Sequence, residues 1–143
     1  MDRTVGEVMH RGVLTCLQET PIQEVAQKMT EHDVSALVVV NDQGNMIGLI
    51  SRTDLVNARL YEQYWKNWQD LKAMNIMVSD VVCVKTSDTI RTASKLMMDR
   101  KIHRVVVIEE ADTGKKPIGV LSITDLVREI AGHQSLVPAK SDP

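Results

Sequence analysis

The sequence predicts an α/β protein built from two β-α-β-β-α repeats that pack about a pseudo-twofold axis. Two observations support this fold class: the sequence contains an internal repeat, and the hydrophobic pattern changes in the same order within each copy of it. The composition agrees, because 43% hydrophobic and 25% charged residues in a chain of 143 are typical of a globular protein. One copy alone is too small to bury a comfortable core, so we expect the two copies to pack together.

The internal repeat is seen in two successive offsets. An offset of 68 residues places Met9 on Met77, and an offset of 71 residues places the segment 48–54 on the segment 119–125. The three extra residues must lie in the connection before Gly119, because loops absorb insertions. This alignment places repeat one at residues 5–60 and repeat two at residues 73–131.

Each copy begins with a short strand, at 13–17 and 81–85, followed by a helix with a recognisable start. In copy one, Thr20 is the expected N-cap, with Pro21 and Gln23 at the first and third helical positions. In copy two, Asp88 is the expected cap. The apolar residues that follow recur at helical spacing and predict one amphipathic helix per copy: Ile22, Val25, Ala26 and Met29, then Ile90, Ala93 and Met97.

A hairpin and a second helix complete each copy. The β-branched runs at 37–40 and 105–108 are typical of buried strands. A Gly-containing turn leads from each run into a second hairpin strand, at 46–50 and 117–121. A further helix is expected from about Arg52 in copy one and from about Ile123 in copy two.

The segment 61–72 between the copies holds all four aromatic residues: Tyr61, Tyr64, Trp65 and Trp68. We expect a continuous helix that extends from the end of copy one. Two interpretations stay open, because an aromatic stripe can pack on the protein's own surface or serve as a surface for self-association or a partner. The tail 134–143 is expected to be flexible.

Several classes of function are not expected from this sequence. A net charge of -2 provides no basic field for nucleic acid. The longest apolar run, 36–40, is far shorter than the roughly 18 residues of a membrane helix, and no secretory leader is visible, so a cytoplasmic location is expected. Cys16 and Cys83 lack a C-x-x-C spacing, which favours reduced thiols. No metal site is expected at the histidines His10, His32 and His133.

The element Gly-x-x-Ser-x-Thr-Asp occurs once in each copy and carries the most information about function. Its Ser and Asp, Ser51 with Asp54 and Ser122 with Asp125, have the spacing of helix capping boxes. The same geometry also suits a ligand. A helix N-terminus with a hydroxyl can hold a phosphate, and a carboxylate one turn later can accept both hydroxyls of a ribose. Glycines at 48 and 119 would let a base or sugar approach the backbone.

The two copies together resemble a tandem pair of cystathionine-β-synthase (CBS) domains, or Bateman module, over nearly the whole chain. The resemblance rests on Met9 and Met77, on the strands at 34–40 and 101–108, and on the two Gly-to-Asp elements. It implies a module that is not an enzyme, forms a homodimer, and binds an adenosine-containing ligand (AMP, ADP, ATP or S-adenosylmethionine) in two clefts between the repeats. Such a compound would be a ligand, and no catalytic cofactor is expected.

The second copy is also similar to the nucleotide-sensing γ subunit of AMP-activated protein kinase. In that family a His-Arg pair, matched here by His103 and Arg104, helps to bind phosphate. Copy one has Ser35 and Ala36 at the matching positions, so the resemblance implies unequal clefts, with the better one at Asp125.

The resemblance implies two sets of ligand-binding residues. In the first cleft Asp125 would take the ribose hydroxyls, Ser122 the phosphate, and the residues of copy one the adenine. This set is Met9, Leu14, Val34, Ser35, Ala36, His103, Arg104, Val120, Ser122, Thr124 and Asp125. The second cleft would use Ser51, Thr53, Asp54, Met77, Val82 and Ile102, together with His103.

Two functions of different classes follow from these patterns. The first is a regulatory module that senses the adenosine-containing ligand and passes the change to its dimer or to a protein partner. The second is a ligand-independent dimerisation or protein-interaction module that uses the aromatic segment. Catalysis is not expected, because Ser51 and Ser122 have no visible base, and no phosphate loop or metal cluster occurs in the sequence.

Overall fold

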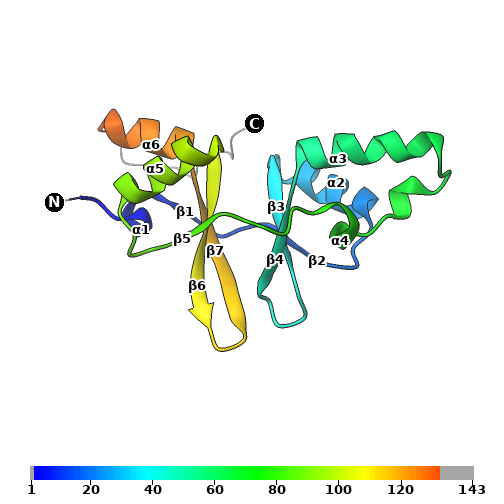
Figure 1. Cartoon of the computed structure of the whole chain (residues 1–143), viewed down its shortest axis with the longest axis horizontal. Coiled ribbons are helices and arrows are strands. Elements are labelled where there is room, and N and C mark those ends of the chain that lie inside the picture. Colours follow the sequence, from blue (N-terminus) through cyan, green and yellow to red (C-terminus); the bar gives the residue numbers. More distant parts are fainter. Residues whose placement is uncertain (1, 133–143) are drawn as a thin grey trace. The chain divides into compact units, whose positions relative to one another are not determined.

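The computed structural model describes residues 2–132, which fold into two compact units (Figure 1). The terminal unit combines the chain up to Val13 with the chain from Val81 onward, and the central unit is Leu14–Asp80. The unit boundaries therefore fall about ten residues after the start of each repeat. The first residues of repeat one, 5–13, which we call its lead-in, fold with the rest of repeat two. The lead-in of repeat two, residues 73–80, folds with the rest of repeat one.

The central unit has a three-stranded sheet in the order β2-β3-β4. Strand β2 runs parallel to β3, and β3 pairs with β4 as an antiparallel hairpin. The elements are β2 (Thr15–Leu17), α2 (Ile22–Glu31), β3 (Ala36–Val40), β4 (Met46–Ser51), α3 (Arg52–Ala58) and α4 (Ala73–Ile76), with short 3-10 helices η1 (Arg59–Gln63) and η2 (Trp68–Asp70).

The terminal unit repeats this plan with one extra strand, in the order β1-β7-β6-β5. Strand β5 is parallel to β6, while β7 is antiparallel to both β6 and β1. The elements are α1 (Val5–Val8), β1 (His10–Arg11), β5 (Cys83–Lys85), α5 (Ile90–Arg100), β6 (Arg104–Ala111), β7 (Gly114–Ser122) and α6 (Ile123–Ile130). The predicted β-α-β-β-α order is thus confirmed in both copies.

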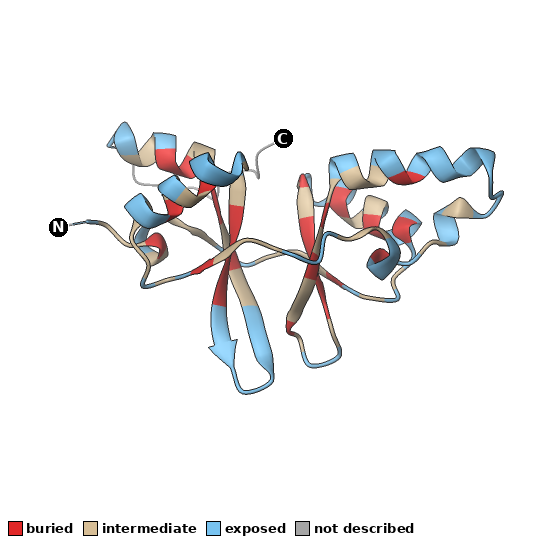
Figure 2. Ribbon diagram, viewed as in Figure 1, coloured by how far each residue is buried: buried red, intermediate tan, exposed pale blue. Residues whose placement is uncertain are grey.

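Each unit has its own apolar core between its sheet and its helices. Alternate residues of the predicted buried strands, Leu37 and Val39 in one unit and Val105 and Val107 in the other, are fully enclosed (Figure 2). The first helices supply their predicted stripes, with Met29 and Met97 at matching places. Burial of these side chains is the main favourable contribution to folding, at about 25 cal/mol per Å² of apolar surface.

Both predicted caps of the first helices are wrong by one residue. Helix α2 begins at Ile22, so Pro21 is the N-cap, and the Thr20 hydroxyl accepts a hydrogen bond from the Leu17 amide instead. Helix α5 is capped by Thr89, whose hydroxyl accepts from the Thr92 amide. Polar residues that precede a helix can close the preceding turn as well as cap the helix, and spacing alone does not separate the two roles.

The predicted continuous aromatic helix is also wrong. Helix α3 ends at Ala58 and tightens into η1, and the chain turns at Tyr64 before η2 begins. The Arg59 guanidinium lies over the Trp68 ring at 5.9 Å, which folds the segment back on itself. The segment returns to the central unit through the Ile22 amide, which donates to the Leu71 carbonyl at 2.8 Å. The expectation of a flexible tail at 134–143 concerns residues outside the described range.

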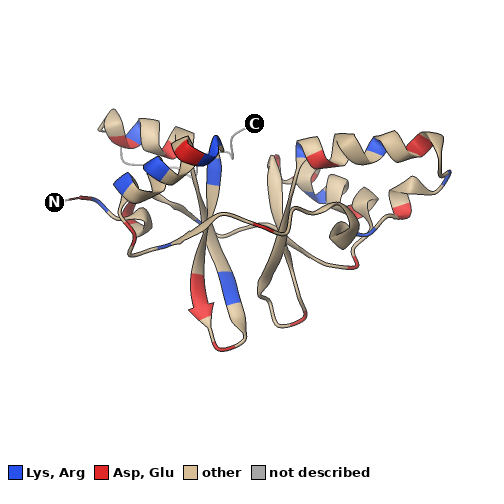
Figure 3. Cartoon of the chain, in the orientation of Figure 1, with Lys and Arg blue, Asp and Glu red and all other residues tan. Residues whose placement is uncertain are grey.

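The three-residue insertion lies in the β6–β7 hairpin, as predicted. This hairpin extends to Ala111 and Gly114, beyond the matching end of β3–β4. Its exposed end pairs acidic residues of β6 with basic residues of β7, Glu109 with Lys116 and Glu110 with Lys115 (Figure 3). Cross-strand pairs of opposite charge stabilise a hairpin modestly and keep its tip soluble.

Candidate functional site

The Ser51 and Asp54 pair forms a capping box at the start of α3. The Asp54 amide donates to Ser51 Oγ at 3.3 Å, and Asp54 Oδ2 accepts from the Ser51 amide at 2.8 Å and from its hydroxyl at 3.0 Å. All of these bonds use one carboxylate oxygen. Within the part of the chain that the structure describes, no hydrogen bond or ion pair reaches Asp54 Oδ1.

The Ser122 and Asp125 pair forms the same box at the start of α6. Asp125 Oδ2 accepts from the Ser122 amide at 2.9 Å, and Ser122 Oγ accepts from the Asp125 amide at 3.2 Å. Capping, the structural interpretation of the repeated motif, is therefore confirmed twice. Capping uses only Oδ2 of each carboxylate, so it leaves Oδ1 as the oxygen that could meet a ligand.

In each copy, the residue before the first hairpin strand accepts a hydrogen bond from the first amide of the helix that carries the capping box. The Arg52 amide donates to the Ser35 carbonyl at 3.1 Å, and the Ile123 amide donates to the His103 carbonyl at 2.9 Å. The side chains differ, since the His103 ring is exposed whereas Ser35 is only 4% exposed. Among the described residues, Ser35 Oγ is a buried hydroxyl without a hydrogen-bond partner. Such a group is costly unless something outside the protein satisfies it.

Methionine side chains fill the space beside the two motif glycines. A Cβ atom on Gly48 would collide with the Met77 side chain, and one on Gly119 would collide with Met9 and with the His10 carbonyl. The expectation that these glycines leave room for a base or sugar is wrong in this structure. Their missing side chains instead admit the two methionines, which pack against the apolar cores of their units.

A contact that the sequence analysis missed joins His10 to Asp125. His10 Nδ1 lies 3.0 Å from Asp125 Oδ1, and Arg128 Nη1 lies 4.0 Å from the same oxygen. The Asp125 side chain is only 4% exposed, while the His10 side chain is 27% exposed. The Asp125 carboxylate is thus engaged on both oxygens. From the sequence, His10 is not expected to bind a metal, and its spacing indicates no other role.

The repeat alignment contains a signal for this contact. At the offset of 68, His10 matches Val78, and at the offset of 71, Arg128 matches Asn57. These two differences between the copies lie at the residues that contact Asp125. The signal was visible only once β1 had been placed beside β7, because nothing in the sequence says that position 10 lies near position 125.

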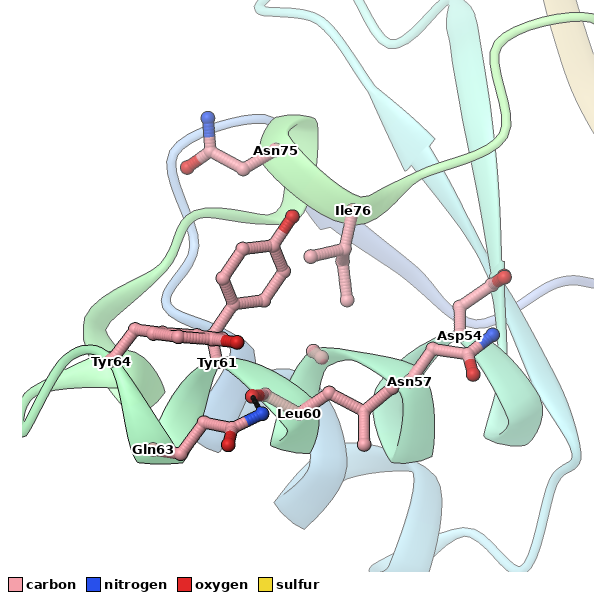
Figure 4. A pocket seen from close by; sticks show the side chains of 9 residues that line it. Asp54, Asn57, Leu60, Tyr61, Gln63, Tyr64, Asn75 and Ile76 are labelled. Atoms are coloured by element: carbon pink, nitrogen blue, oxygen red, sulfur yellow. Dashed lines mark hydrogen bonds between the residues drawn. The ribbon is translucent and has the colours of Figure 1, made fainter.

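An open pocket of about 550 Å³ lies against α3 and α4 in the central unit (Figure 4). Asp54 stands at one end, and the ring of Tyr61 points toward Asn75 and Ile76 at the other. The remaining lining residues are Asn57, Ala58, Leu60, Gln63 and Tyr64. The lining combines one carboxylate, three amides and two phenol rings without a Lys or Arg, so it suits an uncharged or cationic molecule better than an anion.

The predicted ligand residues divide between the two units. From the first set, Met9, Arg104 and Asp125 belong to the terminal unit with His103, Val120, Ser122 and Thr124, whereas Leu14, Val34, Ser35 and Ala36 belong to the central unit. From the second set, Ser51, Thr53, Asp54 and Met77 belong to the central unit, and Val82 and Ile102 to the terminal unit. The structure brings each Ser and Asp pair together with its Met, and the full sets stay predictions.

Two side chains have perturbed pKa values for clear reasons. Hydrogen bonds from Thr4 to the Glu7 carboxylate lower the pKa of Glu7 below its usual value. Burial raises the pKa of the Cys16 thiol. Neither residue lies in the predicted sets. In the range 2–132 there is no group of three or more His, Cys, Asp or Glu residues suited to a metal ion, and no helix long and apolar enough to cross a membrane.

A sequence model of the CBS domain family matches residues 5–61 and 73–132. An uncharacterized protein of Methanopyrus kandleri is 34% identical over 125 residues, which are 87% of this chain and 61% of that protein. The γ-3 subunit of 5'-AMP-activated protein kinase from Sus scrofa is 23% identical over 84% of this chain and 24% of its own length. The chain thus spans less than two thirds of these curated relatives.

Solved structures of CBS domain pairs share the fold. The CBS domain pair of protein MJ0100, in complex with 5'-methylthioadenosine and S-adenosyl-L-methionine, superposes with a TM-score of 0.78 at 18% identity, covering 92% of this chain and 98% of that one. CBSX2 in complex with AMP gives a TM-score of 0.76 at 22% identity, covering 91% and 97%. At these identities the likeness establishes the architecture of the chain.

Proposed function

This chain belongs to the CBS domain family, and from that premise we propose that it is a regulatory module that senses an adenosine-containing ligand. The candidates are AMP, ADP, ATP and S-adenosylmethionine. The observation that carries the proposal is the repeated capping box, in which the capping bonds use Oδ2 of each Asp and leave Oδ1 outside the box. A carboxylate oxygen held in this way is suited to accept hydrogen bonds from the hydroxyls of a ribose.

Other contacts near the central motif support the proposal. Asp54 combines an Oδ1 that lacks a partner within residues 2–132 with a place at the end of the 550 Å³ pocket. The buried Ser35 hydroxyl belongs to the residue whose carbonyl holds the first amide of α3, and it lacks a partner within the same range. Unsatisfied polar groups of this kind are often completed by a ligand or a water molecule.

The residues proposed to bind ligand are the two sets predicted from the sequence. Asp54 and Asp125 take ribose hydroxyls, Ser51 and Ser122 assist at the helix starts, and the His103 and Arg104 pair contacts a phosphate, for which Arg104 supplies positive charge. The relatives lend support, since CBS domain pairs have been crystallised with AMP and with S-adenosyl-L-methionine. We propose no catalytic role, a homodimer as the working form, and a cytoplasmic location.

Thermal unfolding tests this function directly. A ligand that binds the folded chain raises the melting temperature by mass action, and a ligand at about 100 times its Kd contributes roughly 2.7 kcal/mol. We expect at least one of AMP, ADP, ATP and S-adenosylmethionine at millimolar concentration to raise the melting temperature, with inosine as a control for the base. No rise with any of the four compounds would refute the proposal for these ligands.

A second candidate function, dimerisation or protein interaction without ligand, is favoured by one observation. Tyr64 is 81% exposed, and Leu60, Tyr61 and Trp65 beside it are also exposed, which is unusual for four large apolar side chains on one short segment. Trp65→Ala would then shift the mass measured by light scattering while none of the four nucleotides changes the melting temperature. An unchanged mass would exclude this candidate as a role of Trp65.

A further inference from the structure

The two capping-box carboxylates have the same local geometry but different neighbours. Leu49 of β4 pairs with Val78, and Val120 of β7 pairs with His10. Leu49 and Val120 are matched residues of the two copies, each five positions before its Asp. Val78 and His10 therefore occupy matched places, and only His10 carries a hydrogen-bond donor.

This difference decides whether Oδ1 of the Asp carboxylate has a partner within the protein. Asp125 Oδ1 lies 3.0 Å from His10 Nδ1 and 4.0 Å from Arg128, and the Asp125 side chain is 4% exposed. The positions that match His10 and Arg128 in the other copy are Val78 and Asn57, and Asp54 Oδ1 has no hydrogen-bond or ion-pair partner in the range 2–132. Both oxygens of the Asp125 carboxylate have partners within the protein, whereas Asp54 is one of the residues that line the 550 Å³ pocket.

We propose that His10 is a built-in occupant of the ribose site at Asp125, and that it makes Asp54 the stronger acceptor for an uncharged nucleoside. This inference rests on the proposed function of the two Asp residues. A ribose hydroxyl that donates to Asp125 Oδ1 must displace or share the donor already present, and it must also reach a nearly enclosed side chain. At Asp54 neither cost arises.

The inference reverses the order of the two sites expected from the sequence, but only for ligands without phosphate. The His103 and Arg104 pair favours a phosphorylated ligand at Asp125, whereas His10 opposes the sugar that such a ligand carries. Adenosine therefore isolates the contribution of His10, because it presents the same ribose hydroxyls with no phosphate. The identity of residue 10 would set the selectivity of this site for nucleotide over nucleoside.

The experiment is calorimetric titration with adenosine in a background where only the Asp125 site remains. Asp54→Ala should bind adenosine weakly, and adding His10→Val, which installs the residue of the matched position, should tighten Kd by about tenfold, as expected when a charge-assisted hydrogen bond no longer competes. His32→Gln is the control, because the exposed His32 ring hydrogen-bonds the Lys28 carbonyl of its own helix, and no hydrogen bond or ion pair of the described residues joins it to either Asp. An unchanged Kd with His10→Val would overturn the inference.

The reciprocal variant keeps the test decisive should His10→Val unfold. In an Asp125→Ala background, Val78→His places a donor beside Asp54 and should weaken adenosine binding by about tenfold; unchanged binding counts against the inference. The proposed function fails separately. If the wild type binds AMP and His10→Val changes nothing, the function survives and the inference is overturned. If only the His10→Val protein binds, the inference stands and the wild type is not a sensor. If neither the wild type nor the His10→Val protein binds AMP, ADP, ATP, S-adenosylmethionine or adenosine, both the proposed function and the inference are refuted.

Discussion

Val78 and Leu49 exchange backbone hydrogen bonds in both directions, each 2.9 Å long. This bridge joins the lead-in of repeat two to the last strand of repeat one, and it places Val78 at the position that matches His10 in the other unit. The pairing makes the central unit a folding unit of residues 14–80, which is shifted from the repeat seen in the sequence.

Replacing Val78 by proline should destabilise the central unit. Proline lacks the amide that donates to the Leu49 carbonyl, and its loss leaves a strand carbonyl without its partner, at a cost of about 1–3 kcal/mol. Val78→Ala, which retains the amide, is the control and should cost much less because Val78 is exposed. Urea unfolding measures both. Equal losses would mean that the side chain, and not the bridge, holds the lead-in.

Stability lost on substituting Gly48 should be partly recovered by a second substitution, whereas stability lost on substituting Gly119 should not. Gly48→Ala and Gly119→Ala each place a Cβ against a methionine and should cost about 1–3 kcal/mol from overpacking. Shortening Met77 to Ala should recover part of the loss at Gly48, because only that side chain obstructs. Shortening Met9 should not recover Gly119→Ala, because the His10 carbonyl also obstructs there. Thermal unfolding of the two double variants compares them, and equal rescue would contradict the backbone contact.

Asp125→Ala should destabilise the chain more than Asp54→Ala. Both remove a capping interaction worth about 0.5–2 kcal/mol. Only Asp125→Ala also leaves His10 and Arg128 without the buried carboxylate between them, for a further loss of about 1–3 kcal/mol. Urea unfolding without ligand checks the difference. A larger loss at Asp54 would show that the His10 contact contributes nothing to folding.

The two cysteines should differ in their reaction with a thiol reagent. Burial raises the pKa of Cys16, so the folded protein favours the neutral thiol. A raised pKa contributes stability that is present below the pKa of the unfolded state and is lost as the pH rises through the folded value. Native protein at pH 8 should therefore be alkylated at Cys83 first, and Cys16→Ser should reduce the loss of stability on raising the pH. Equal alkylation rates, read by mass spectrometry, would contradict burial of Cys16.

Glu7 should stabilise helix α1 only while it is ionised. Its pKa lies below the usual value of 4.5 because Thr4 donates hydrogen bonds to the carboxylate. A lowered pKa contributes stability above the unfolded value, and that contribution is lost as the pH falls through the folded value. Glu7→Gln should therefore be less stable than the wild type at pH 7 and equal to it well below pH 4.5. A difference that persists at low pH would show that the charge is not responsible.

Local sequence patterns were sufficient to predict the elements that depend on neighbouring residues alone. The β-branched runs predicted β3 and β6, and the spacing from Ser122 to Asp125 predicted a capping box that the structure contains. Helix starts were less certain, since Thr20 and Asp88 bond the preceding turn instead of the helix. The aromatic segment is not a continuous helix. The contact between Arg59 and Trp68 stabilises a turn, and helix propensity does not predict such a contact.

The amino-acid sequence by itself determined the duplicated β-α-β-β-α plan and the two Ser and Asp helix starts, because hydrophobic period and capping depend on residues a few positions apart. Tertiary structure decided that His10 meets Asp125, while Val78, at the matching position of the other repeat, pairs with Leu49. The contact of His10 with Asp125 joins positions more than one hundred residues apart in the chain. It exists only because the lead-in of each repeat folds against the other repeat, which no local pattern encodes.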